Sequence, residues 1–470
     1  MKKVYIYALA YALTAVSCQD NEWGADSATP QAPEIEIPMG AADGELLIKF
    51  VPEMSDILDQ TLTRVGGVAT RSGIPSTDEV LNILGAYHFE RVFPVDPKTE
   101  KRTREAGMHL WYIVRFDKDA DLKEAARQLR KLGEISKIQS NPTLQRAYDP
   151  KKKTLYLSAS DLQHVIRTSE GLTFNDPGLK HQWHYRNAGN YDFVKKDRAE
   201  AIAGADVNCG EAWELCKGDP SIIVAVLDEG VMWSHPDLIA NMWTNEAEEI
   251  GSTEDKDGNG YKGDRYGYNF VKNTGVISWT SADDTGHGTH VAGTIAAENG
   301  NSIGVSGIAG GDGNTGSGVK IMTCQLFDGQ YGATLAAEAK AIKYAADNGA
   351  VVLQCSWGYN SPDANEALGY VPGPKNEQDW ENQYPLEKEA LDYFIHNAGS
   401  PNGVIDGGLA IFASGNEYAP SSSFPAGYSK CISVSAIAAD YTPSSYTNYG
   451  AEITPVSYTH LRAHETRSNL

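Results

Sequence analysis

The sequence predicts an α/β protein: a doubly wound, mostly parallel sheet with helices on both faces, preceded by a small α+β domain. The first observation is a globular composition, with 41% hydrophobic and 22% charged residues among 470, which is enough chain for more than one domain. The second is that, from about residue 205, nearly continuous apolar segments alternate with segments of helical spacing. Such alternation is typical of a parallel sheet covered on both faces.

The elements of the larger domain follow from this alternation. We expect buried strands at 221–228, 319–326, 350–356, 409–414 and 431–436. Helical spacing of apolar residues predicts helices at about 288–298, 333–347 and 386–397. In such a sheet the reactive groups gather at the carboxyl ends of the strands. We assign the larger domain to residues 201–454.

The preceding segment, 41–148, has the pattern of a small α+β domain. Strand-like segments lie at 45–50, 110–116 and 134–139. The helix predicted at 121–132 begins with acidic residues and ends at Lys131 and Gly133. Residues 149–200 are rich in polar side chains and include three consecutive lysines, and we interpret them as a connector.

The N-terminus has the pattern of an export signal. Two lysines precede an apolar run at 4–16, which is too short for a membrane-spanning helix. The segment Leu-Thr-Ala-Val-Ser-Cys that ends at Cys18 resembles a bacterial lipobox. It predicts a signal at 1–17, lipidation of Cys18, a tether at 18–40, and anchoring at the outer membrane or cell surface of a Gram-negative bacterium. The alternative is a plain secretory signal in which Cys18 is incidental.

The charge is acidic overall and divided along the chain. The formal net charge of −22 argues against a general nucleic-acid binder. Basic residues exceed acidic ones by 7 over 97–153, whereas acidic residues exceed basic ones by 18 over 221–450. The two surfaces either are independently solvated or attract each other. In the second case the small basic domain docks on the acidic one.

Three polar residues of the larger domain occupy positions suited to catalysis. Asp228 ends an apolar strand, His287 stands where glycines give way to a helix, and Asn416 ends another strand. A carboxylate can stabilise an imidazolium, and an Asn amide can donate a hydrogen bond to a developing oxyanion. Each residue alone has an ordinary structural interpretation, such as a turn former or a core histidine.

Together these segments resemble those of the subtilisin-like serine proteases (subtilases). The segments, in chain order, are Val-Leu-Asp-Glu-Gly-Val (226–231), Gly-His-Gly-Thr-His-Val-Ala-Gly-Thr (286–294) and Ala-Ser-Gly-Asn (413–416). Shorter matches occur at 175–177, 182–184, 355–358, 424–426 and 446–450. The resemblance implies a subtilisin-like fold and a serine endopeptidase that acts on proteins or peptides and needs no cofactor for its chemistry. It also implies that 41–148 is an inhibitory, fold-assisting pro-domain.

The resemblance also implies roles for individual residues. His287 would be the general base and then acid, Asp228 would hold its tautomer, and Asn416 would donate to the oxyanion. The strand Cys355, Ser356, Trp357 and Gly358 would bind the substrate as an added strand.

Two neighbouring residues leave alternatives open. Glu229 stands where the family usually has a small residue, and its carboxylate either perturbs the local pKa or points to solvent. His290 is three residues from His287, so it is either a zinc ligand together with Asp283 or Asp284, or a structural histidine. The sequence has no His-Glu-x-x-His pattern, which favours the structural role.

A separate acidic loop has the spacing of a calcium site. Asp255, Asp257 and Asn259 alternate before a glycine, and Asp264 could replace the usual bidentate glutamate. A structural Ca²⁺ and a solvated acidic turn are the two interpretations.

The serine of this family lies in a Gly-Thr-Ser-Met-Ala-x-Pro segment, and no such segment follows 446–450. Residues 455–470 lack an apolar period and resemble a translated sequencing adapter, so we expect the native sequence to depart from the printed one near residue 454. The catalytic domain would then be incomplete and the printed chain inactive. Two functions remain: a serine endopeptidase whose nucleophile is missing from this chain, or a catalytically inactive binding or regulatory lipoprotein.

Overall fold

The computed structural model describes residues 41–65, 68–69, 71–85, 88–117, 119–146, 174–189, 201–451, 453 and 456–458. Within these ranges no helix combines the length and the apolar character that crossing a bilayer requires. Cys18, the signal, the tether and most of the connector lie outside the described residues. We call 41–146 the N-terminal subdomain and 201–458 the C-terminal subdomain.

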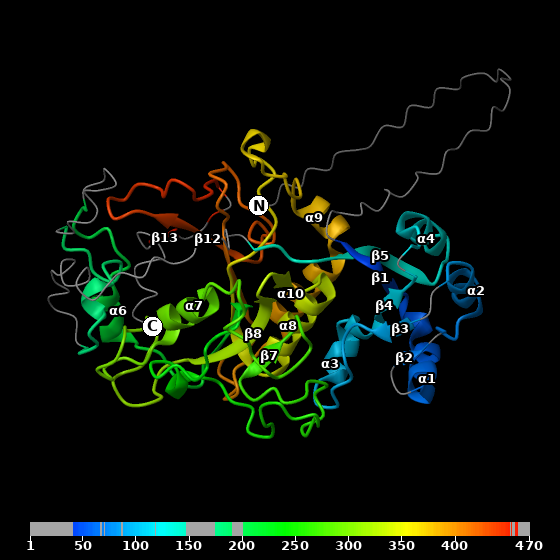
Figure 1. The fold of residues 1–470 in the computed structure, drawn as a ribbon, viewed down its shortest axis with the longest axis horizontal. Coiled ribbons are helices and arrows are strands. Elements are labelled where there is room, and N and C mark those ends of the chain that lie inside the picture. The colour runs from blue at the N-terminus through cyan, green and yellow to red at the C-terminus, as the bar shows by residue number, and fades with distance from the viewer. Residues whose placement is uncertain are drawn as a thin grey trace, which may run out of the picture. The chain divides into compact units, whose positions relative to one another are not determined.

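The N-terminal subdomain confirms the predicted α+β class (Figure 1). Its five strands form an antiparallel sheet in the order β2-β3-β4-β1-β5. The strands are β1 (Ala41–Phe50), β2 (Val68–Ala69), β3 (His88–Arg91), β4 (Trp111–Arg115) and β5 (Ile135–Pro142). The helices are α1 (Ser55–Val65), α2 (Pro75–Ile83), α3 (Glu100–Glu105) and α4 (Leu122–Leu129).

This small sheet buries both of its faces, because successive side chains of a strand point in opposite directions. On β1, Leu46 and Ile48 pack with residues of α1, α2 and α4. Leu47, between them, packs instead into the core of the C-terminal subdomain. On β4, Trp111 and Ile113 likewise join that second core. The N-terminal subdomain therefore shares an apolar interface with the rest of the chain.

The C-terminal subdomain confirms the predicted parallel sheet covered by helices (Figure 1). Seven strands lie in the order β13-β12-β11-β10-β6-β8-β7, all parallel, and the short β9 pairs antiparallel with β8. The strands are β6 (Ile223–Glu229), β7 (Gly267–Asn269), β8 (Lys320–Asp328), β9 (Tyr331–Gly332), β10 (Ala350–Cys355), β11 (Leu409–Ala413), β12 (Ile432–Ile437) and β13 (Val456–Tyr458). The helices are α6 (Cys209–Leu215), α7 (His287–Ala296), α8 (Leu335–Asp347), α9 (Glu377–Gln383) and α10 (Pro385–Asn397).

Both faces of the central strand β6 are buried, as its unbroken apolar sequence predicts. Ala225 and Leu227 pack in one cluster with residues of α8 and α10. Val224 and Val226, on the opposite face, pack in another with residues of α7. At the far edge, Val456–Tyr458 pair with β12, so the described part of the segment 455–470 extends the sheet.

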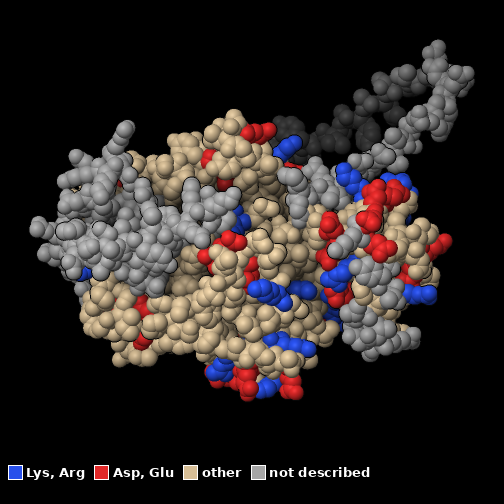
Figure 2. Space-filling model, in the orientation of Figure 1, with Lys and Arg blue, Asp and Glu red and all other residues tan. Residues whose placement is uncertain are grey.

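A partly buried carboxylate joins the two subdomains. Glu389 of α10 accepts hydrogen bonds from Lys49 Nζ at 2.8 Å, Lys137 Nζ at 2.9 Å and Trp111 Nε1 at 2.7 Å. Although burial raises the pKa of Glu389, the charges of the two lysines bring it below its ordinary value. On the face drawn in Figure 2, acidic and basic side chains are mixed over the N-terminal subdomain.

Two side chains of β5 cap helices of the C-terminal subdomain. Gln139 Oε1 accepts the backbone N–H of Leu386 at 2.8 Å, and Asn141 Oδ1 accepts that of Ala336 at 3.0 Å. Both amides lie in the first turn of a helix, where no intrahelical carbonyl is available. The N-terminal subdomain therefore completes α10 and α8.

Candidate active site

Asp228 lies where the order of the large sheet changes direction. β6 is the first strand of this sheet in the chain; β7 and β8 follow on one side and β10 to β13 on the other. A crevice forms at such a switch point, beyond the carboxyl ends of the strands. Asp228 is only 1% exposed, and its Oδ1 accepts the backbone N–H of Glu229 at 2.6 Å. The carboxylate is therefore held in one orientation at the edge of this crevice.

His287 is the first residue of α7, and its ring meets Asp228. Its Nδ1 lies 2.7 Å and 2.8 Å from the two carboxylate oxygens of Asp228. The following residue allows this approach, because a Cβ on Gly288 would lie 2.1 Å from the backbone oxygen of Glu229. The structure thus brings together the Asp and His that the sequence singled out. His290 is buried in the same helix.

Glu229 points inward and fixes the beginning of α7, so the solvent-facing alternative is wrong. Its side chain is 1% exposed. The carboxylate accepts the backbone N–H of Thr285 and that of His287, both at 3.0 Å. An anion at a helix N-terminus is favourable because the first amides and the helix dipole are positive there. Glu229 therefore anchors the turn that carries His287.

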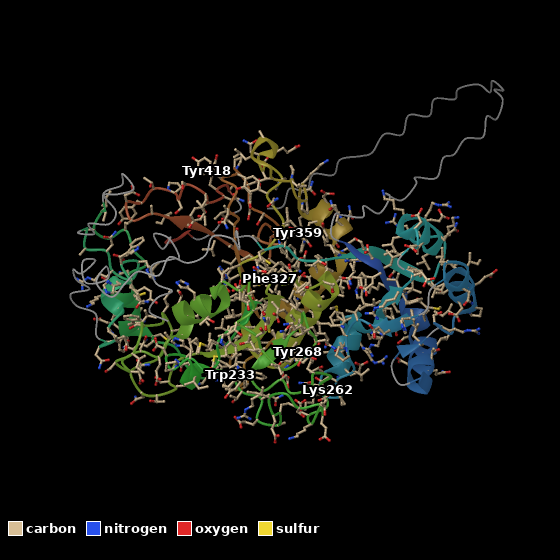
Figure 3. All side chains as sticks on the ribbon, viewed as in Figure 1. Trp233, Lys262, Tyr268, Phe327, Tyr359 and Tyr418 are labelled. Carbon is tan, nitrogen blue, oxygen red and sulfur yellow. The ribbon has the colours of Figure 1, made fainter. Side chains whose placement is uncertain are left out.

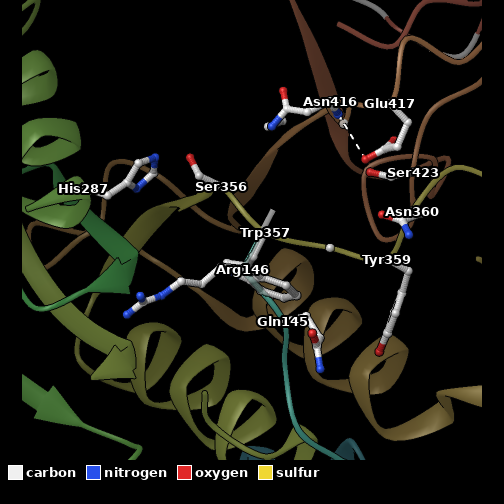
Figure 4. A pocket seen from close by; sticks show the side chains of 13 residues that line it. Gln145, Arg146, His287, Ser356, Trp357, Tyr359, Asn360, Asn416, Glu417 and Ser423 are labelled. Carbon is white, nitrogen blue, oxygen red and sulfur yellow. Dashed lines mark hydrogen bonds between the residues drawn. The ribbon is translucent and has the colours of Figure 1, made fainter. Parts of the chain in front are cut away.

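A cavity of about 190 Å³ adjoins His287. It is lined by Gln145, Arg146, His287, Ser356, Trp357, Gly358, Tyr359, Asn360, Ala413, Gly415, Asn416, Glu417 and Ser423. Figure 4 shows Ser356 close to His287 and Asn416 farther along the same wall. The cavity thus brings His287 and Asn416 together with three of the four residues proposed to bind substrate.

The fourth residue of that group needs a correction. Cys355 is the last residue of β10, and its side chain is fully buried in the core. Because strand side chains alternate, Ser356 faces the cavity whereas the Cys355 thiol faces the interior. Burial raises the pKa of this thiol well above its ordinary value. Cys355 supports the strand from behind.

The last described residues of the N-terminal subdomain enter the same cavity. Thr143 forms an antiparallel bridge with Thr334, and the N–H of Leu144 donates to the carbonyl of Ala333 at 2.8 Å. Arg146 then forms an antiparallel bridge with Trp357. Sequence reasoning did not single out Arg146, although it stands near the end of the basic domain.

The acidic loop is built differently from the calcium loop that the spacing predicts. Oxygens of Asp255 and Asp257 do come together, but the third member is Glu248, and the three carboxylate oxygens lie within 4.8 Å of one another. Glu248 was missed because it lies outside the regular spacing. Three carboxylates are the oxygen ligands that Ca²⁺ prefers, so these residues fit the ion.

Asn259 and Asp264, the other two predicted ligands, are turned elsewhere. Asp264 is fully buried and accepts hydrogen bonds from Asn259 Nδ2 at 3.0 Å and the Tyr344 hydroxyl at 2.8 Å. Burial raises the pKa of Asp264 to about 6, although these hydrogen bonds oppose the shift. Asn259 and Asp264 therefore connect the loop to α8 through hydrogen bonds. Neither residue belongs to the candidate calcium site.

Comparison with known proteins matches this architecture to one family. The subtilase family model matches residues 219–461, a range that contains Asp228, His287 and Asn416. Halolysin of Haloferax mediterranei is 32% identical over 53% of this chain and 37% of its own length. Thermitase of Thermoactinomyces vulgaris is 28% identical over 53% of this chain and 66% of its own.

Two further likenesses extend over more of the chain. The extracellular protease of Xanthomonas campestris is 27% identical over 73% of this chain and 48% of its own length. A crystal structure of Aeromonas sobria serine protease with its chaperone has a TM-score of 0.44 and 21% identity, covering 67% of this chain and 47% of that one. The chain therefore spans between about a third and two thirds of the curated relatives that it matches. Since the family match covers more than half of its residues, this chain belongs to the subtilase family of serine peptidases.

Proposed function

We propose that the protein is an exported serine endopeptidase in which His287, held by Asp228, activates a serine. The observation that carries the proposal is the contact of His287 Nδ1 with both carboxylate oxygens of the buried Asp228, at 2.7 Å and 2.8 Å, at the edge of a cavity. Donation of the Nδ1 proton to Asp228 leaves Nε2 as the basic nitrogen. Nε2 can then accept the proton of a nucleophile and return it to the leaving amine.

The chemistry of the remaining site follows from the positions of the other residues. Asn416 is exposed on the cavity wall, where its amide can donate to the oxyanion of a tetrahedral intermediate. The backbone around Trp357 already pairs with an extended segment of this chain. A substrate peptide would add to the same edge as an antiparallel strand.

The nucleophile in this proposal is a serine on a glycine-flanked segment beyond 446–450, a segment that the 470 residues do not contain. Reading the gene across the codon for Thr454 tests this part directly. We expect an in-frame Gly-Thr-Ser-Met-like segment and hydrolysis of casein by the resulting protein. A confirmed stop after Leu470 would refute the endopeptidase proposal for this gene product and favour the inactive, peptide-binding alternative.

We further propose that the N-terminal subdomain is an inhibitory pro-domain. Its end lines the cavity beside His287, its β5 side chains cap α8 and α10, and two of its lysines pair with Glu389. Added in trans, residues 41–148 should inhibit hydrolysis, and salt should weaken that inhibition because charges contribute to docking. Inhibition that salt leaves unchanged would remove the electrostatic part of the argument.

The setting of the enzyme is also part of the proposal. Two relatives are named as extracellular proteases, which supports export, and lipidation of Cys18 would anchor the chain to a membrane. Protein or peptide substrates are the proposed partners, with no nucleic acid. Ca²⁺ held by Glu248, Asp255 and Asp257 would have a structural role, because these residues are not part of the proposed catalytic group.

A further inference from the structure

The side chain of Arg146 is buried against acidic groups of the C-terminal subdomain. It is only 8% exposed. Its Nη2 lies 3.3 Å from Glu229 Oε1 and 3.7 Å from Asp284 Oδ1, and its Nη1 donates to the carbonyl oxygen of Asp283 at 3.1 Å. The guanidinium carbon lies 5.6 Å from the centre of the Phe327 ring. Phe327, labelled near the centre of Figure 3, is itself buried.

The acidic groups that receive Arg146 are fixed in place by their own subdomain. Glu229 and Asp284 are 1% and 2% exposed at their side chains. Glu229 accepts backbone N–H groups of the turn before α7, and Asp284 accepts those of Ser281 and Gly329. The positions of these two carboxylates are therefore fixed by hydrogen bonds within residues 229–329 of the C-terminal subdomain.

Two buried carboxylates side by side favour a cationic occupant. Burial and the charges of Glu229 and Asp328 raise the pKa of Asp284, which shows that like charge is concentrated there. A guanidinium is suited to such a place because it is planar, weakly hydrated and carries several donors. The Phe327 ring adds a cation–π contact.

The main chain of Arg146 occupies a substrate-like position. It forms an antiparallel bridge with Trp357, on the strand that we propose to bind peptides. Figure 4 shows its side chain running away from Trp357, below His287 and Ser356. A peptide that pairs with the same strand would present its own side chain to Glu229 and Asp284.

We propose that Glu229 and Asp284 form a specificity subsite that selects arginine, and lysine less strongly, at the substrate position that pairs with Trp357. This inference rests on the proposed peptide-binding function and names its substrate class: peptides with a basic residue at that position. Arg146 occupies this subsite as long as the N-terminal subdomain stays docked on the C-terminal subdomain. Glu229 is thus both the anchor of the His287 turn and a recognition residue.

The test measures peptide binding by the 470-residue chain, without requiring catalysis. In an Arg146→Glu variant, Glu229 and Asp284 repel the introduced carboxylate, so the chain's own segment leaves the subsite. If the Arg146→Glu variant does not fold, Arg146→Ala is used instead. The probe is fluorescein-labelled Pro-Thr-Leu-Gln-Arg-Ala, compared with the same peptide carrying citrulline, which keeps the shape of arginine without its charge. The matched control variant is Lys101→Glu, which makes the same reversal of charge at an exposed residue of α3.

We expect the arginine peptide to bind to the Arg146→Glu chain at least about tenfold more tightly than the citrulline peptide does. In the Lys101→Glu chain we expect neither peptide to displace the segment that carries Arg146. Adding Glu229→Gln should reduce that ratio towards one. Equal binding of the two peptides, or binding of neither, overturns the subsite. Hydrolysis is scored separately in the serine-containing protein: arginine-selective binding without hydrolysis refutes the proposed function and leaves the subsite standing.

Discussion

Replacing Glu389 with alanine should loosen the N-terminal subdomain from the C-terminal one. The substitution removes the acceptor of three hydrogen bonds of 2.7–2.9 Å, from Lys49, Trp111 and Lys137. Removing one partner of a buried ion pair costs about 3–5 kcal/mol. Because the lysines are 16% and 35% exposed at their side chains, water recovers part of this, and we expect a loss of about 2–4 kcal/mol.

The assay is hydrogen exchange of the backbone amides of Leu386 and Ala336, whose acceptors belong to the N-terminal subdomain. A loss of 2–4 kcal/mol in docking should accelerate their exchange by roughly 30- to 1000-fold, while amides within β6 should change little. Glu366→Gln, which alters an exposed glutamate, is the control and should leave all these rates unchanged. Unaltered exchange at Leu386 and Ala336 in Glu389→Ala would show that the interface does not depend on this carboxylate.

Three further predictions concern packing, pH and metal. Gly288→Ala should destabilise the fold by about 1–3 kcal/mol, because the new Cβ would lie 2.1 Å from the Glu229 backbone oxygen; urea unfolding checks this, with Gly133→Ala, where no neighbouring atom lies within 4 Å, as the neutral control. Burial raises the pKa of Glu387 to about 7 and that of the adjoining buried Glu338 well above 4.5, so the stability contributed by this protonated pair is complete below about pH 4.5 and is lost as the pH rises through about 7. Glu387→Gln should therefore flatten the dependence of the unfolding midpoint on pH over that interval, and an unchanged slope would contradict the assignment. Ca²⁺ at a concentration far above its Kd should raise the Tm of the protein by several degrees. EDTA should reverse this rise, and Asp257→Asn should reduce it. A Tm that does not change with Ca²⁺ would instead indicate a solvated acidic turn.

The sequence predicted the central strands and helices of the C-terminal subdomain because their burial on both faces leaves a strong pattern. The segment expected at 221–228 is β6, and the helix expected at about 386–397 is α10. Short or polar elements such as β7 and α9 were not predicted. Their three and seven residues carry too few apolar positions to define a period.

The site shows a similar division between local and long-range information. Asp228 and His287 stand in specific local motifs, and the structure brings them into contact. The placement of Arg146 beside Glu229 depends on how the end of the N-terminal subdomain crosses the sheet, which no local pattern records. Glu248 was missed as a candidate metal ligand for the same reason, since only the folded loop brings it to Asp255.

The most direct test of the proposed chemistry is the rate at which a fluorophosphonate labels the serine-containing protein. His287→Ala is compared with His396→Ala, which removes an exposed histidine of α10. If His287 activates the nucleophile, labelling should fall by about 10³-fold or more in His287→Ala and stay unchanged in His396→Ala. Equal labelling of the two variants would contradict the role assigned to the Asp228–His287 pair.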